Sequence, residues 1–162
     1  MMNICLLGAS GSIGSQTLDV MKRNEQEFNL VGFSVGKRTN KIPTILKHNP
    51  NVDLIDINLG CPAPKVVKTG AGSALLKDPK ALEEMFKKIC KHSPIPVTAK
   101  IRLGWNEETI NFKENIKALE NAGVAAIGIH ARTTRQGYAG KPRYDLIKDL
   151  RLEMKVPLIV SG

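Results

Sequence analysis

A cysteine and an asparagine stand where α/β proteins place reactive groups. The segment 56–62 (DINLGCP) follows the apolar run 52–55, which predicts a strand, and ends in a Gly-Cys-Pro turn. Chemistry in parallel α/β proteins collects where buried strands give way to loops. A thiol there can move a proton, and an amide can orient a ligand. We therefore predict an active-site edge around Asn58 and Cys61.

A glycine-rich turn, residues 8–14 (GASGSIG), lies between a predicted strand at 3–8 and a predicted helix at 12–23. Glycines let backbone N–H groups approach a pyrophosphate, and the following helix N-terminus favours an anion. The spacing is GxxGxxG instead of the commoner GxGxxG. A tight strand-to-helix turn without a ligand is the alternative. The candidate phosphate ligands are Gly8, Ser10, Gly11, Ser12 and Ile13.

The end of the second predicted strand bears on which nucleotide would bind. An NAD site needs an acidic residue there, but the chain reads SVGKR at 34–38. Two adjacent cations suit a 2′-phosphate, so we predict NADP, held by Gly36, Lys37 and Arg38. A solvated basic turn is the alternative.

Strands and helices alternate along the chain. Apolar runs predict strands at 3–8, 30–35, 52–57, 96–103, 124–130 and 156–160. Helices are predicted at 12–23, 41–47, 78–91, 107–122 and 144–152, with Asp78 as an N-cap and Gly123 as a C-cap. Six β/α units in this order demand right-handed crossovers and a mainly parallel sheet. The chain is thus predicted to be a single α/β domain over 1–162.

Two architectures fit this pattern. We favour a Rossmann-like three-layer sandwich, in which helices cover both faces of the sheet. The alternative is an open partial (β/α) barrel, whose uncovered inner face would expose Val, Ile and Leu side chains and could drive formation of a homo-oligomer. Strand count alone does not separate the two.

Composition limits the class of protein. The 162 residues are 42% hydrophobic and 4% aromatic, which suits one globular domain with an aliphatic core. The three cysteines, Cys5, Cys61 and Cys90, show neither disulfide nor metal-ligand spacing, so we predict no metal site. Without a signal peptide or membrane span, we expect a cytoplasmic protein. The net charge of +9 favours polyanionic partners, although basic solvated helices give the same number.

The start of the chain resembles a known enzyme family. Residues 4–37, with GASGSIGSQTLDV and LVGFSVGK, resemble the amino-terminal NADPH-binding segment of 1-deoxy-D-xylulose 5-phosphate reductoisomerase. The likeness extends to about residue 50. Nothing that follows matches the metal-binding carboxylates of that family, so the resemblance implies nucleotide binding without isomerisation chemistry.

The rest of the chain resembles a second family. Residues 52–162 contain DINLGCPAPKVVKTGAGSALLKDP, VTAKIRLGW, GIHARTTRQGYAGK and PLIVSG, and are similar to flavin-dependent tRNA-dihydrouridine synthases. The resemblance implies that FMN supplies a hydride to C6 of a uracil while Cys61 protonates C5. It also implies flavin contacts from Asn58, Lys100 and His130. Candidate RNA contacts are Lys65, Lys68, Arg102 and Arg132.

Position along the chain agrees with this assignment. Cys61, Lys100 and His130 each lie at or near the end of a successive predicted strand, so one sheet edge would bring them together. Without the family motif, each residue also has an interpretation that involves no function. Cys61 would be an inert loop cysteine, Lys100 a solvated lysine and His130 a structural histidine.

Taken together, the two resemblances predict a chimera, with residues 1–50 from one family and 51–162 from the middle of a barrel of the other. We interpret the junction as engineered, with a fused reading frame as the alternative. The predicted function is at most NADP binding without full catalysis. The alternative is a truncated FMN-dependent tRNA-dihydrouridine synthase core, an oxidoreductase fragment related to tRNA by ancestry and with weakened FMN binding.

Overall fold

A computed structural model describes residues 1–6, 8–35, 39–48 and 53–162. Within these ranges the chain forms two compact units, Met1–Ile57 and Asn58–Gly162. The predicted segment boundary at residues 50–51 lies outside the described residues, as do the predicted NADP ligands Gly36, Lys37 and Arg38. Whether the two units act as one domain stays a prediction.

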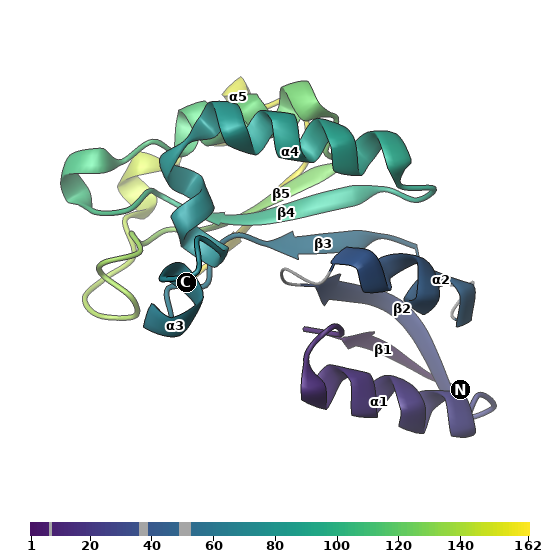
Figure 1. Ribbon diagram of the computed structural model, residues 1–162. Coiled ribbons are helices and arrows are strands. Elements are labelled where there is room, and N and C mark those ends of the chain that lie inside the picture. The colour runs from purple at the N-terminus through teal and green to yellow at the C-terminus, as the bar shows by residue number, and fades with distance from the viewer. Residues whose placement is uncertain (7, 36–38, 49–52) are drawn as a thin grey trace. The chain divides into compact units, whose positions relative to one another are not determined.

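The first unit is a parallel sheet with two helices (Figure 1). Its elements are β1 (Met2–Leu6), α1 (Ser12–Arg23), β2 (Phe28–Val35), η1 (Thr39–Lys41), α2 (Ile42–His48) and β3 (Ile55–Asn58). Strand β2 pairs in parallel with both β1 and β3. The core of this unit is aliphatic and aromatic: Met21, Leu30, Phe33, Val35, Ile45 and Ile55.

The second unit begins with irregular structure and continues as β/α repeats. Its elements are α3 (Pro64–Val67), η2 (Gly72–Lys77), α4 (Pro79–His92), β4 (Val97–Arg102), η3 (Glu107–Thr109), α5 (Phe112–Ala122), β5 (Ala126–His130), η4 (Tyr144–Leu146), α6 (Leu150–Glu153) and β6 (Leu158–Ser161). Strand β5 pairs in parallel with β4 and β6. Helices α4 and α5 pack side by side over β4 and β5 (Figure 1).

These arrangements confirm the predicted α/β class with six strands that alternate with helices. In both units the strands are neighbours in chain order, without the reversal of order that marks a doubly wound sheet. In the second unit α4 and α5 share one face of the sheet. This is the packing of a partial β/α barrel, which was the alternative, and not of the favoured sandwich.

Local signals explain where the helices of the second unit start and end. The Asp78 carboxylate accepts a hydrogen bond from the Ala81 N–H at 3.0 Å, and Pro79 occupies the first helical turn of α4, as predicted. Gly123 ends α5 at φ 91°, a left-handed conformation that glycine adopts without strain. These caps were readable from residue types alone.

Two predicted helices are shorter than expected. The helix predicted at 107–122 begins at Phe112, because Asn106 and Thr109 cap each other across a 3₁₀ turn and Ile110 forms an antiparallel bridge with Gly104. The helix predicted at 144–152 is a 3₁₀ turn followed by the short α6. In both places a 3₁₀ turn stands where the first helical turn was predicted.

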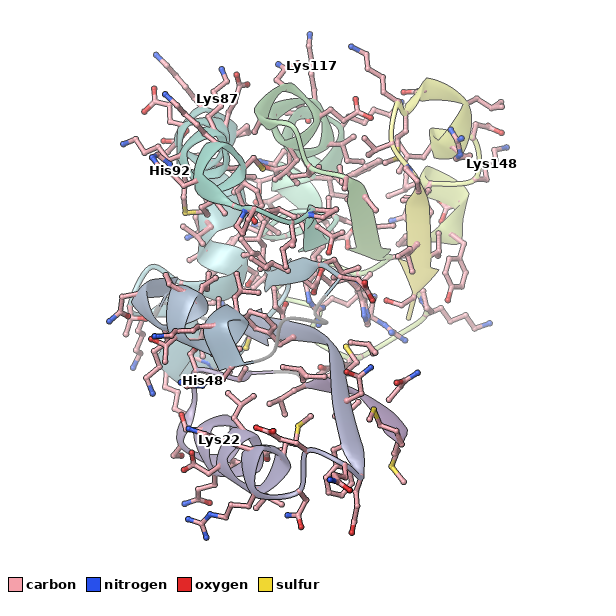
Figure 2. The ribbon with its side chains drawn as sticks, turned by 90° about the vertical axis from the view of Figure 1, so that its right-hand side faces the viewer. Lys22, His48, Lys87, His92, Lys117 and Lys148 are labelled. Carbon is pink, nitrogen blue, oxygen red and sulfur yellow. The ribbon has the colours of Figure 1, made fainter. Side chains whose placement is uncertain are left out.

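Part of the positive charge of the chain is spread over helix surfaces. Figure 2 shows Lys87, His92 and Lys117 pointing outward from α4 and α5, and both lysines are exposed. On α4 and α5, therefore, basic side chains on solvated helix surfaces account for part of the net charge, as the alternative interpretation proposed. Across the described residues, every helix is too short or too polar to serve as a membrane span.

Candidate active site

The sheet of the second unit has two chemically different faces. Side chains alternate along a strand, and the face under α4 and α5 is aliphatic: Val97, Ala99, Ile101, Ile127 and Ile129. On β4 and β5 the opposite face is polar or small: Thr98, Lys100, Arg102, Ala126, Gly128 and His130. The expectation of an aliphatic inner face is therefore wrong for these two strands.

Lys100 lies across its neighbouring strand because that strand carries a glycine. Lys100 and Gly128 are paired in register on β4 and β5. A Cβ placed on Gly128 would come within 2.5 Å of Lys100 Cδ, closer than carbon atoms approach. The missing side chain thus leaves a channel in which the lysine stem runs over the sheet surface.

Arg102 holds three loops together from the end of β4. Its side chain is only 2% exposed. Nε donates to the Gly60 carbonyl at 2.7 Å, and one terminal nitrogen donates to the carbonyls of Thr133 at 3.0 Å and Gly137 at 2.7 Å. Burial lowers the pKa of this guanidinium. Arg102 therefore positions the site, and its burial removes it from the surface that an RNA would touch.

His130 is a neutral ring surrounded by cations. Desolvation, followed by the charges of Arg102, Lys100 and Arg132, lowers the pKa of His130 from 6.5 to about 4. Its Nε2 lies 3.1 Å from an Arg132 terminal nitrogen, which can only donate, so Nε2 is the acceptor and Nδ1 carries the proton. The ring also packs edge-on against Tyr138, with centroids 5.9 Å apart.

The loop after β3 is tied to the same end of β4. The Leu59 N–H donates to the Lys100 carbonyl at 2.8 Å, and the Asn58 side-chain oxygen accepts from the Gly60 N–H at 2.8 Å. Asn58 itself is exposed. These bonds place Asn58 and Cys61 beside the strand end that carries Lys100 and Arg102.

Cys61 is held by the segment that follows α3. Its carbonyl accepts hydrogen bonds from both the N–H and the hydroxyl of Ser73, at 3.1 and 3.0 Å. Gly72 approaches so closely, at φ 60°, that a Cβ would lie 2.7 Å from that carbonyl oxygen. The backbone of Cys61 is therefore fixed, while its side chain is only partly buried.

The predicted phosphate turn lies in the first unit. Gly8 has φ 75°, and its carbonyl accepts from the Gly11 N–H at 2.9 Å. Ser10 is buried, Ser12 begins α1, and Ile13 is 78% exposed. A Cβ at Gly14 would meet the Gly8 carbonyl at 2.3 Å, so close packing accounts for this glycine without a ligand. NADP binding here stays a prediction, and the open alternative, a tight turn, describes the observed contacts.

The sequence analysis did not predict three features that shape the site. They are the close backbone approach at Gly72, the space left by Gly128, and the inward position of the Arg102 side chain. A signal existed for Gly128, because a glycine inside a strand often marks a close approach of another group. For Arg102 there was none, since nothing local shows that a strand-end arginine turns inward.

The geometry defines a class of site. Loops and strand ends of a parallel β/α repeat carry one thiol, one lysine that lies across the sheet, two arginines and a neutral histidine. Such an edge suits an anionic or electron-rich ring ligand. Among the described residues, no group of three or more His, Cys, Asp or Glu side chains is placed to hold a metal ion.

Comparison with known proteins defines the family. The sequence profile of the dihydrouridine synthase (Dus) family matches residues 24–162, and the chain belongs to this family. It is 41% identical over 110 residues to tRNA-dihydrouridine synthase B of Pasteurella multocida (strain Pm70), covering 68% of this chain and 33% of that protein. The corresponding protein of Vibrio vulnificus (strain CMCP6) is 42% identical over 109 residues, covering 67% and 34%. The chain thus spans about one third of these relatives' length.

The predicted chimera finds no support. The family match begins at residue 24, well inside the segment assigned to the reductoisomerase family. A solved structure of 1-deoxy-D-xylulose 5-phosphate reductoisomerase from Zymomonas mobilis, in complex with NADPH, aligns with 98% of this chain and 38% of its own, at 18% identity and a TM-score of 0.32. A similarity this weak carries no argument.

Proposed function

We propose that this chain forms the flavin-facing part of a tRNA-dihydrouridine synthase, an oxidoreductase that reduces uridine in tRNA. The observation that carries the proposal is that Arg102 connects the loop of Cys61 with the strand that carries His130. Arg102 binds the loop that precedes Cys61, and it lies in register with His130 on the next strand. A thiol and a cationic ring-binding surface are thereby held at one edge.

The residues present fit a flavin. The Gly128 channel leaves room for Lys100 to reach the electron-rich edge of an isoalloxazine ring, where a cation stabilises developing negative charge. Arg132 Nε is buried without a hydrogen-bond partner, a donor that a ligand acceptor would satisfy. His130 is neutral and presents its Nδ1–H as a donor. We assign Asn58, Lys100 and His130 as flavin contacts.

The role of Cys61 follows from its anchoring. Bound FMN would supply the hydride in such a reaction. A general acid must present its proton from a fixed place, and the two hydrogen bonds from Ser73 fix the Cys61 backbone while leaving the thiol accessible. Lys65 and Lys68 lie exposed on and just after α3, where they can meet RNA phosphates.

The first experiment titrates the full chain with FMN and follows flavin fluorescence. Lys100→Met is expected to weaken binding about tenfold or more, because a charged contact contributes about 1.5–3 kcal/mol. Lys117→Met is the matched control, since Lys117 points outward from α5 (Figure 2) and should bind FMN as the wild type does. Equal loss in both variants would show non-specific attraction and contradict the assigned site.

The second experiment concerns turnover. Unmodified tRNA, FMN and NADPH are incubated with the chain, and dihydrouridine is quantified by mass spectrometry. If product forms, Cys61→Ala should abolish it and Cys5→Ala, which alters an exposed thiol of the first unit, should not. Product formation that survives Cys61→Ala would refute the general-acid assignment. Flavin binding without product would confine the proposal to cofactor binding.

A further inference from the structure

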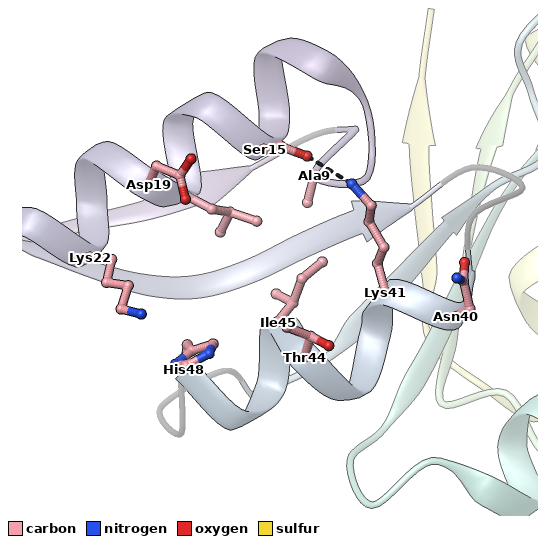
Figure 3. Close-up of a pocket in the computed structure, with 10 residues that line it drawn as sticks. Ala9, Ser15, Asp19, Lys22, Asn40, Lys41, Thr44, Ile45 and His48 are labelled. Carbon is pink, nitrogen blue, oxygen red and sulfur yellow. Dashed lines mark hydrogen bonds between the residues drawn. The ribbon is translucent and has the colours of Figure 1, made fainter.

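A cavity of about 430 Å³ lies in the first unit between α1 and α2 (Figure 3). Its volume is in the range of small-molecule sites. Helix α1 contributes Ser15, Leu18 and Lys22, and Lys41, Ile45 and His48 come from η1 and α2. The proposed dihydrouridine synthase function uses none of these residues.

Each end of the cavity carries a lysine. At one end Lys41 Nζ donates to the Ser15 hydroxyl at 3.1 Å, a contact that uses one of its three donors. At the other end Lys22 and His48 face each other (Figure 3). Ser15 and Lys22 are two turns apart on α1, so the ends are separated by about 10 Å at a rise of 1.5 Å per residue.

Between these ends the lining is mainly apolar, with Thr44 and Asp19 as its polar members. Ile45 projects from α2 and Ala9 lies near Ser15 (Figure 3), and Leu18 of α1 belongs to the same lining. Ile45 and Ala9 are 6% and 0% exposed, so this part is well packed on its far side. Among the described residues of the lining, Asp19 is the one carboxylate, against two lysines. These side chains together carry a net positive charge.

We propose that this cavity binds a small organic dianion that has an acidic group at each end of a short apolar chain. Lys41 and Ser15 hold one acid group, Lys22 and His48 hold the other, and Leu18 and Ile45 pack against the chain between them. Each acid group meets a donor with a positive charge, which gives stronger hydrogen bonds than neutral pairs. An inorganic anion would fill one end only and lose the apolar contact.

The probe is suberate, a linear dicarboxylate, titrated into the full chain and followed by amide chemical shifts in NMR. Saturable shifts confined to α1, η1 and α2 are expected. Octanoate, with one acid group, and malonate, with a shorter chain, should each bind about tenfold more weakly. Octanoate binding as tightly as suberate would reduce the site to an apolar pocket and overturn the two-ended proposal, as would the absence of saturable shifts.

Lysine variants locate the binding. Lys41→Met and Lys22→Met should each weaken suberate binding about tenfold, whereas Lys41→Arg retains the charge and should retain most of the affinity. Lys47→Met is the matched control, since Lys47 is exposed on α2 outside the lining. Circular dichroism checks that each variant is folded. Equal losses in Lys47→Met and Lys41→Met would mean diffuse attraction by a basic surface and would refute the proposal.

Discussion

His130 should make this protein sensitive to mild acid. In the folded chain the pKa of His130 is about 4, whereas it is 6.5 when the ring is free in water. Between these values the unfolded chain binds a proton that the folded chain does not, so stability is present above about pH 6.5 and falls as the pH drops toward 4. Protonation would also place a fourth positive charge beside Lys100, Arg102 and Arg132, and remove the acceptor that Arg132 uses.

The size of the effect follows from the shift. One pKa unit corresponds to about 1.4 kcal/mol, so the full shift corresponds to about 3.4 kcal/mol, of which about 2.4 kcal/mol falls between about pH 7 and pH 4.5. The ring retains some contact with water, which screens the three cations, and we expect about half of this, roughly 1–1.5 kcal/mol. The variant His130→Gln has no titrating group and should lack this part of the acid sensitivity.

The assay is urea unfolding of the wild type and His130→Gln at about pH 7 and about pH 4.5. Acidic residues contribute equally to both proteins, so the difference between their losses isolates His130. Wild type should lose about 1 kcal/mol more than the variant. Equal losses, or an NMR titration that places the His130 pKa near 6.5, would refute the argument that burial and three cations keep the ring neutral.

Three other substitutions test close packing and capping. Gly128→Ala should displace the Lys100 stem and weaken FMN binding about tenfold in a fluorescence titration, with the unfolding midpoint little changed because the lysine side chain can move. Gly14→Ala places a Cβ 2.3 Å from a backbone oxygen that cannot easily shift, and should lower the free energy of unfolding by about 2 kcal/mol or more in urea. Asp78→Ala removes the 3.0 Å cap of α4 and should cost about 1 kcal/mol, measured in the same way, whereas Asp78→Asn should cost less.

Each of these has a result that would contradict it. Unchanged FMN affinity in Gly128→Ala would mean that the lysine does not use the channel. A fully stable Gly14→Ala would show that the turn can relax. An Asp78→Ala protein as stable as the wild type would show that α4 is held by tertiary packing alone.

Alternation and caps were readable from the sequence because they depend on neighbours along the chain. Apolar runs separated by helical periodicity predicted the parallel α/β class, and Asp78 and Gly123 marked the ends of helices with local hydrogen bonds and backbone conformation. The motif around Cys61 and the glycines that follow pointed to the family that the profile confirms. The reductoisomerase resemblance of the first fifty or so residues finds no support in the comparisons, and a short glycine-rich βα turn is shared by many unrelated proteins.

The sequence by itself thus determined which residues lie at strand ends, since a strand end is a local property. Only the tertiary structure decided what those residues do there. Arg102 turns inward because three carbonyls from separate loops converge on it, and Lys100 can cross β5 only because the residue beside it in register is Gly128. Such contacts join residues that are far apart in the chain, and no periodicity or spacing records them.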